Sequence, residues 1–113
     1  MRDGYMRTSE GYFIIYSITS RQSFDEVCGF REQIMSVRDT DTLPIILCGN
    51  KCDLVNEREC SIEDGKAVAD LWGIPFFETS ALKGTNVEES FFALVKEIRQ
   101  WKYSPRTTHK KKR

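Results

Sequence analysis

The run of residues 12–18, YFIIYSI, most constrains the fold of this 113-residue chain. Almost every residue in it is apolar, aromatic or β-branched, and polar residues do not alternate with apolar ones. A strand with one face in water shows such alternation, so this run predicts a strand that is buried on both faces. Residues 43–48 (LPIILC) predict a second buried strand, and residues 74–80 (IPFFETS) predict a third, shorter one.

A helical pattern follows each of these strands. Ser20 is the expected N-cap of the first helix, residues 61–64 (SIED) have the spacing of a capping box for the second, and Asn86 is the expected N-cap of the third. Gly73 is placed to end the second helix in a left-handed conformation. The side chains expected on the buried faces of the three helices are Phe24, Val27, Cys28, Ile34, Val37, Arg38, Val68, Leu71, Trp72, Phe91, Phe92, Val95, Ile98 and Trp101.

Strands that alternate with helices predict an α/β fold, in which three parallel strands alternate with three helices and both faces of the sheet are covered. In such sheets ligands bind in the loops that follow the carboxyl ends of the strands. Residues 49–54 (GNKCDL) and 78–84 (ETSALKG) each follow a predicted strand directly. Both loops are therefore expected at the ligand-binding edge of the sheet.

The cysteines argue against a metal or disulfide framework. Cys28, Cys48, Cys52 and Cys60 have irregular spacings without a CxxC motif, and His109 is far away in the sequence. We expect no zinc site and four reduced thiols. The sequence contains no 18-residue apolar run and no charged-then-apolar start, so neither a membrane span nor a signal peptide is expected.

The zero net charge conceals an asymmetry. Residues 102–113 carry six basic side chains and no acid, so residues 1–101 carry a net charge of −6. The sequence thus predicts an acidic domain followed by a basic tail.

The first loop has the chemistry to recognise guanine. Guanine presents two adjacent donors on one edge, its N1–H and its exocyclic amino group, and the carboxylate of Asp53 is suited to accept both. Adenine has an acceptor at N1, so the same carboxylate would be left unpaired against it. The stem of Lys51 could lie along the base, and the amide of Asn50 could hold the base or the neighbouring loop.

The second loop is expected to complete the site. The backbone N–H groups of Ala81 and Leu82 could point to the base carbonyl, while the Ser80 hydroxyl braces Asp53. Asn, Lys and Asp are also common turn formers, so NKCD alone is compatible with an ordinary loop. The second loop, at the matching place after the next strand, favours the binding interpretation.

The sequence resembles the Ras subfamily of small GTPases over about residues 1–103. GNKCDL and ETSA resemble the guanine-specificity motifs NKxD and SAx. The opening MRDGYMRTSEGYFIIYSITSRQSFDEV resembles the Ras, Rap and Rit branches of the subfamily, in which a similar MRDQYMR run ends the second switch. The resemblance implies that Asn50, Lys51, Cys52 and Asp53, together with the second loop at Ser80, Ala81 and Leu82, form the guanine-binding site. Two positions depart from the family pattern, since Leu82 stands where Lys is usual and Gly4 where Gln is usual.

The phosphate-binding part of such a site is not found in the sequence. No G-x-x-x-x-G-K-[ST] motif occurs, and the resemblance places the family's DxxG motif, catalytic Gln and switch Thr upstream of Met1. We therefore expect the carboxyl-terminal half of a Ras-type domain (1–103) with a basic, flexible tail (104–113). The run 12–18 is expected to lack its family neighbour and to form a long apolar edge.

This expectation limits the activity. The chain should offer neither catalytic residues nor magnesium ligands, so we expect no intrinsic GTPase activity. GTP or GDP should be contacted through the base alone, with roughly high-micromolar to millimolar affinity.

The resemblance implies a signalling switch at the cytosolic face of a membrane, with the effectors and regulators of Ras-type proteins as partners and no nucleic acid. The tail RTTHKKKR resembles a polybasic segment, but no lipidation cysteine follows it. A solvated tail, weak contact with an anionic membrane and nuclear import all remain open for it.

Two other functions of the chain also remain open. One is a non-catalytic interaction module that pairs through its open strand edge or competes for regulators at residues 1–7. The other is a truncated fragment without nucleotide binding.

Overall fold

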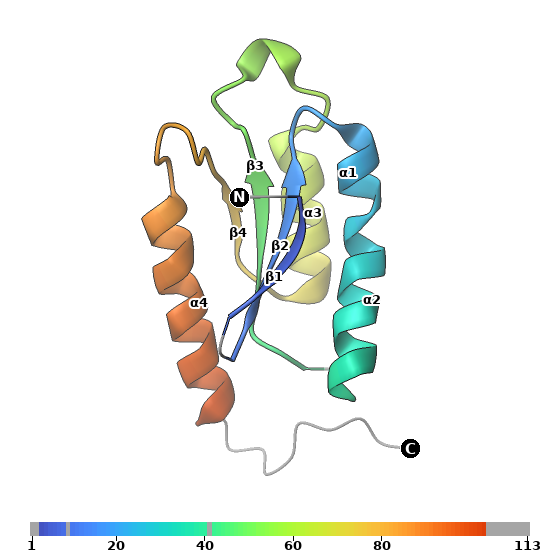
Figure 1. Ribbon diagram of the computed structural model, residues 1–113, viewed down its shortest axis with the longest axis vertical. Helices are drawn as coiled ribbons and strands as arrows, with labels where there is room; N and C mark the ends of the chain where they lie inside the picture. Colours follow the sequence, from blue (N-terminus) through green and yellow to red (C-terminus); the bar gives the residue numbers. More distant parts are fainter. Residues whose placement is uncertain (1–2, 9, 41, 104–113) are drawn as a thin grey trace.

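The computed structural model describes residues 3–8, 10–40 and 42–103, so the predicted tail lies outside the described residues. Its strands form one four-stranded sheet in the order β1-β2-β3-β4, with helices on both sides (Figure 1). The elements in chain order are β1 (Gly4–Arg7), β2 (Tyr12–Ser17), α1 (Arg21–Asp25), α2 (Val27–Arg38), β3 (Ile45–Asn50), the short 3₁₀ helix η1 (Val55–Glu57), α3 (Ile62–Trp72), β4 (Phe76–Glu78) and α4 (Val87–Lys102).

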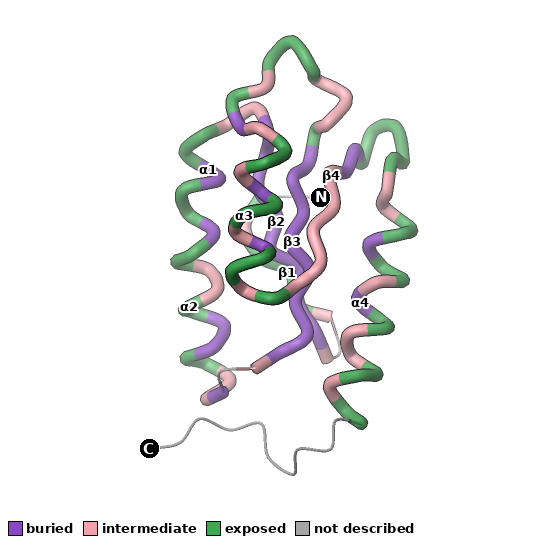
Figure 2. Tube along the Cα trace, turned by 180° about the vertical axis from the view of Figure 1, so that it is seen from behind, coloured by how far each residue is buried: buried purple, intermediate pink, exposed green. Residues whose placement is uncertain are grey.

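The three predicted strands are present and parallel. β2 pairs with β3, and β3 pairs with β4. Every residue of β2 and β3 is buried, which confirms the interpretation of the two unbroken apolar runs (Figure 2). β4 has only three residues and is half-buried, because it lies at the edge of the sheet.

The sheet separates two apolar clusters, and alternate residues of its strands face opposite sides. The cluster toward α1, α2 and α3 contains Tyr12, Ile14 and Tyr16 of β2. The cluster toward α4 contains Phe13 and Ile15 of the same strand. Both faces of the sheet are therefore covered, as the order of elements predicts.

The predicted helix ends are largely confirmed. The Ser20 hydroxyl accepts a hydrogen bond from the Ser23 N–H at 3.2 Å. Ser61 and Asp64 form both bonds of a capping box, and Gly73 ends α3 with a left-handed φ of 68°. Asn86 is the N-cap of α4, but its side chain does not cap the helix. Asn86 is itself left-handed, and its amide donates to the Glu78 carbonyl at 2.9 Å instead.

The buried helix faces differ from the predicted ones. Side chains predicted to be buried but found exposed are Cys28, Val37, Leu71, Phe91, Phe92 and Val95. In α4 the fully buried side chains are Ser90 and Leu94. The apolar stripe of α4 is wider than its contact with the sheet, so the phenylalanines flank that contact. The ring of Phe91 packs edge-on against Phe13 with the centroids 4.8 Å apart.

Strand β1 is a feature that the sequence pattern did not predict. It pairs antiparallel with β2 and covers the edge that was expected to be open. The expectation of a long exposed apolar edge is therefore wrong, and the sheet is mixed rather than wholly parallel. Gly4 takes a φ of 124° at the start of the strand. Residues with a side chain rarely adopt such a φ, whereas glycine adopts it freely.

Candidate functional site

Two loops follow the carboxyl ends of neighbouring parallel strands. The Lys51 loop (residues 51–54) follows β3, and the Ser80 loop (residues 79–85) follows β4. Because β3 and β4 are paired in parallel, both loops emerge at the same end of the sheet. This arrangement confirms the predicted placement of the two loops.

Three hydrogen bonds join the two loops. The Oδ1 atom of Asn50 accepts from the Thr79 hydroxyl at 3.1 Å and from the Ala81 N–H at 3.3 Å. The Cys52 N–H donates to the Thr79 carbonyl at 3.0 Å. Asn50 is only 3% exposed, so its amide joins the two loops at their buried side. Of the two roles that the sequence suggested for Asn50, the structure supports the one toward the neighbouring loop.

The Lys51 loop turns sharply away from the sheet. Lys51 has a left-handed φ of 66°, which is uncommon for a residue with a side chain, and the Leu54 N–H closes the turn on the Lys51 carbonyl at 3.0 Å. Such conformations persist where surrounding bonds hold them, and they gather at functional sites. Lys51 is exposed and Asp53 is half-buried. Within the described residues the Asp53 carboxylate has no hydrogen bond or ion pair, so it is free to accept from a ligand.

The Ser80 loop has a buried base and an exposed tip. Thr79 and Ser80 are fully buried, whereas Ala81 and Leu82 are exposed. The Ser80 hydroxyl accepts from the Lys83 N–H at 3.0 Å. The predicted bond from the Ser80 hydroxyl to Asp53 is not formed, because the hydroxyl bonds within its own loop. The Ala81 N–H, predicted to point to a ligand carbonyl, donates to Asn50 here.

An ion pair beneath the loops was not predicted. Arg58 donates two hydrogen bonds to the Glu78 carboxylate at 2.7 and 2.6 Å and a third to the Cys60 carbonyl at 2.8 Å. The hydrogen bond to Glu78 raises the pKa of Arg58 above its usual value. These residues are 20 positions apart and follow no periodic pattern, so the sequence carried no signal for the pair.

The chain that leaves the Lys51 loop is also tied to β2. The backbone N–H groups of Glu59 and Cys60 both donate to the Ile18 carbonyl, at 2.7 and 3.0 Å. Asn50 therefore anchors the start of the Lys51 loop. The residues that follow the loop are anchored by the bonds to Ile18, just after β2, and by the Arg58–Glu78 ion pair to β4. A site held at both ends is pre-organised for a ligand.

The cysteine in the Lys51 loop is poorly suited to a nucleophilic role. Burial raises the pKa of Cys52, and the negative charges of Glu78 and Asp53 raise it further. A reactive cysteine needs a lowered pKa, because the thiolate is the nucleophile. Cys52 therefore contributes backbone and shape to the loop rather than a reactive group.

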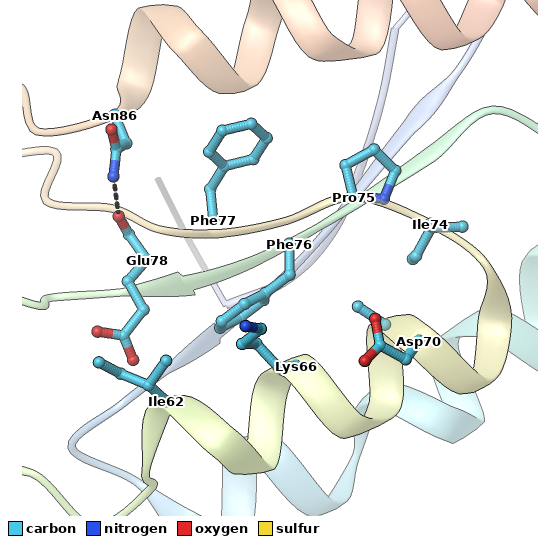
Figure 3. A pocket seen from close by; sticks show the side chains of 10 residues that line it. Ile62, Lys66, Asp70, Ile74, Pro75, Phe76, Phe77, Glu78 and Asn86 are labelled. Atoms are coloured by element: carbon cyan, nitrogen blue, oxygen red, sulfur yellow. Dashed lines mark hydrogen bonds between the residues drawn. The ribbon is translucent and has the colours of Figure 1, made fainter.

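A pocket of about 440 Å³ lies between α3 and β4 (Figure 3). Its walls include the apolar side chains of Ile62, Ile74 and Phe76, with Lys66 and Asp70 among its polar groups. None of the residues predicted to contact guanine lines this pocket. It is therefore separate from the two loops, although Glu78 belongs to its lining.

Within residues 3–8, 10–40 and 42–103, no group of three or more His, Cys, Asp or Glu side chains is arranged to hold a metal ion. In that same part of the chain, no helix is both long enough and apolar enough to cross a membrane.

Comparison with known proteins gives a consistent match. A family model described as "Ras family" matches residues 1–100. A "Ras-like protein" of Laccaria bicolor is 52% identical over 101 residues, which are 89% of this chain and 48% of that protein. "Ras-like protein rasB" of Dictyostelium discoideum is 48% identical over 113 residues, which are 100% of this chain and 57% of that protein. The chain thus spans about half the length of the curated relatives it matches.

Proposed function

The chain belongs to the Ras family, and from this premise we propose that its Lys51 and Ser80 loops bind the guanine base of guanine nucleotides. One observation carries this proposal. Asn50 fixes the two loops side by side, while the half-buried carboxylate of Asp53 stays unpaired within the described residues. An acceptor held in this way has the chemistry that guanine requires.

Asp53 is the proposed reader of the base. Its two oxygens accept the N1–H and the exocyclic amino group of guanine as a pair of charge-assisted hydrogen bonds. Adenine offers no such pair of donors, so its binding would bury the carboxylate without partners. A buried polar group left unpaired costs about 1–3 kcal/mol, and a charged one more. This difference favours guanine over adenine.

Other loop residues would complete the contact. The exposed stem of Lys51 can cover one face of the base, and Leu82, whose side chain is 84% exposed, offers apolar surface nearby. The Ala81 N–H can reach the base carbonyl only by exchanging its 3.3 Å bond to Asn50. That bond is long, so the exchange costs little.

Phosphate binding is not part of this proposal for the 113-residue chain. Its sequence has no G-x-x-x-x-G-K-[ST] motif, and no metal-binding cluster lies among the described residues. We propose that the chain binds the base alone, with a Kd of roughly 0.1–1 mM. We also propose that it does not hydrolyse GTP, because that reaction depends on positioned phosphates and charge stabilisation.

The family relationship suggests the wider role. We propose a part in guanine-nucleotide-dependent signalling, with the effectors and regulators of Ras-type proteins as partners. We also propose a cytoplasmic location with weak contact between the basic residues 102–113 and an anionic membrane surface. Vesicle sedimentation with and without anionic lipid tests that contact, and equal binding to both would contradict it.

The alternative of an interaction module that pairs through an open edge of the strand at residues 12–18 loses its motivation. β1 covers that edge in the structure. Guanine recognition is therefore the function that the described geometry supports best.

Titration of the purified chain with guanosine, GMP and GDP tests the proposal. If only the base is contacted, the three ligands should bind with Kd values that agree within about threefold. Adenosine should bind at least tenfold more weakly. If no guanine ligand binds at millimolar concentration, the proposal is wrong. If GDP binds with much higher affinity than guanosine, the chain does not contact the nucleotide through the base alone.

The substitution Asp53→Asn tests the assigned reader. The amide donates where the carboxylate accepted, so preference should move from guanosine toward xanthosine, which has a carbonyl in place of the amino group. Asp70→Asn is the matched control, because Asp70 is an exposed aspartate on α3 outside both loops. Unchanged preference in Asp53→Asn would show that another residue reads the base.

A further inference from the structure

The outer edge of β4 is open within the described residues. The Pro75 carbonyl and the Thr79 N–H both bond to β3, at 3.1 and 2.8 Å. Backbone groups alternate along a strand, so those of Phe76 and Glu78 point away from β3. The Asn86 amide bonds to the outward Glu78 carbonyl at 2.9 Å (Figure 3). The Phe76 N–H and carbonyl and the Glu78 N–H have no partner among the described residues, so this edge offers donors and an acceptor to a further strand.

The pocket between α3 and β4 lies directly beside this edge (Figure 3). Its volume of about 440 Å³ is large enough for an apolar side chain. Lys66 lies beside Phe76 in Figure 3, and Asp70 lies near Ile74. Both charged residues are exposed, and within the described part of the chain neither has a hydrogen bond or an ion pair. The pocket therefore combines apolar walls with a cation and an anion, placed at different points along β4.

We propose that this edge and pocket together bind an extended peptide segment of a partner protein, which joins the sheet as an antiparallel strand beside β4. In antiparallel pairing one peptide residue, the central residue, exchanges both backbone bonds with Phe76. The peptide residue two positions before it accepts from the Glu78 N–H. Pro75 has no N–H and Asn86 occupies the Glu78 carbonyl, so the open edge is short and suits a peptide better than a long strand of another sheet.

The pocket and its charges define the sequence of this peptide. The Phe76 side chain packs against the cluster toward α3, and directly opposite residues point to the same face, so the central peptide side chain enters the pocket. The walls formed by Ile62 and Phe76 favour an apolar side chain there. Two positions later the peptide passes Ile74, where a basic side chain meets Asp70. Two positions earlier an acidic side chain can pair with the long side chain of Lys66.

Other segments of this chain match the edge less well. A second copy would offer β4 itself, in which Ile74 and Glu78 stand two positions from Phe76, so no base would meet Asp70. Residues 104–113 carry bases but no acid, and no large apolar side chain for the pocket. A partner segment with the pattern acid-x-apolar-x-base, read from its amino end, matches both the backbone groups and the charges.

Amide hydrogen exchange of the full chain tests the strand pairing at single residues. The probe is the synthetic peptide acetyl-Ser-Glu-Thr-Leu-Thr-Arg-Ser-amide, in which leucine is the central residue and the expected Kd is on the order of 1 mM. At a peptide concentration of about five times Kd, exchange at Phe76 and Glu78 should slow about sixfold, since protection scales with 1 + [L]/Kd. Exchange at Phe77, whose amide already points to β3, should not change.

Two N-methylated peptides separate backbone pairing from occupancy of the pocket alone. N-methylation of the leucine removes the N–H that bonds to the Phe76 carbonyl, so affinity should fall about tenfold or more. N-methylation of the threonine that follows it changes an N–H that points away from β4, so affinity should stay within about threefold of the parent peptide. Both peptides keep the leucine side chain. Equal affinity of the two would overturn the proposed strand pairing.

A charge exchange tests the direction of the peptide. Asp70→Lys should weaken binding about threefold, and a peptide with glutamate in place of arginine should restore it. Glu63→Lys is the matched control, because Glu63 is an exposed acid on α3 outside the pocket, and this variant should keep the wild-type affinity. If Asp70→Lys leaves the affinity unchanged, or if the exchanged peptide gives no recovery, the proposed acid-x-apolar-x-base pattern is wrong.

Two further results would overturn the proposal as a whole. One is unchanged exchange at Phe76 and Glu78 with the peptide at about 5 mM. The other is protection of these two amides that increases with protein concentration in the absence of peptide, because it would assign the edge to a second copy of the chain.

Discussion

Arg58 and Glu78 form a two-bond ion pair, with Nη1 to Oε2 at 2.7 Å and Nη2 to Oε1 at 2.6 Å. The side chains are only 23% and 13% exposed. The pair fastens the chain that leaves the Lys51 loop to the last residue of β4, from which the Ser80 loop begins. This ion pair therefore supports the spacing of the two loops, in addition to the hydrogen bonds of Asn50.

Removal of Arg58 should strongly destabilise the fold. Arg58→Ala leaves the Glu78 carboxylate without its cation, and such a loss in a mostly buried pair costs about 3 kcal/mol. Urea unfolding followed by circular dichroism measures the change in the free energy of unfolding. Guanosine affinity should fall as well, because the two loops lose their common support.

A double-mutant cycle is the control for this pair. Arg58→Ala with Glu78→Ala should cost less than the sum of the two single changes, because the double variant buries no lone charge. Strict additivity would mean that the two residues act independently.

The Asn50 amide should support both stability and binding. Asn50→Ala removes the acceptor of the Ala81 N–H and one acceptor of the Thr79 hydroxyl, which should cost about 1–3 kcal/mol of unfolding free energy. Guanosine affinity should fall about tenfold, because the loops no longer share a fixed spacing. Asn56→Ala is the control, since Asn56 is exposed in η1. Wild-type stability and affinity in Asn50→Ala would contradict the role of Asn50 as a tie between the loops.

The sequence predicted those features whose cause is local. The unbroken run of β2, the SIED capping box and Gly73 each carry their signal within a few residues, and the structure confirms all three. The placement of the two loops also follows, because it depends only on the order of strands and helices.

Features that depend on distant partners could not be predicted in this way. β1 forms because Gly4 permits an unusual φ and because β2 offers an edge, and neither condition appears as a periodic pattern. In α4 the apolar period is present, but the width of the covered face depends on the sheet, so the burial of Phe92 was wrongly predicted. The Arg58–Glu78 pair joins two segments through tertiary structure alone.

Alanine substitutions at two helical glycines should change the free energy of unfolding in opposite directions. A Cβ on Gly65 would lie 2.3 Å from the Phe76 ring and 2.5 Å from the Tyr16 hydroxyl. Phe76 can move toward the pocket in Figure 3, but Tyr16 is fully buried, so Gly65→Ala should cost about 1–3 kcal/mol. Gly29 in α2 has open space around it, so Gly29→Ala should raise the free energy of unfolding by about 0.5–1 kcal/mol. Thermal unfolding of both variants shows whether each substitution stabilises or destabilises the fold. A Gly65→Ala variant more stable than the wild type would contradict the packing of α3 on β4.

The capping box of α3 should make stability depend on acid pH. The Ser61 N–H, and then Arg21, hold the pKa of Asp64 below its usual value. A lowered pKa in the folded state means that the contribution of Asp64 is complete above its unfolded pKa, about 3.9, and is lost as the pH falls through the folded value.

The free energy of unfolding should therefore fall more steeply below about pH 4 in the wild type than in Asp64→Asn, and the two slopes should agree between about pH 5 and 7. Asp70→Asn, which changes an exposed aspartate on the same helix, should keep the wild-type slope. Urea titrations across this pH range measure all three proteins. Equal acid slopes in the wild type and Asp64→Asn would mean that the Asp64 carboxylate gains nothing from its bonds to Ser61 and Arg21.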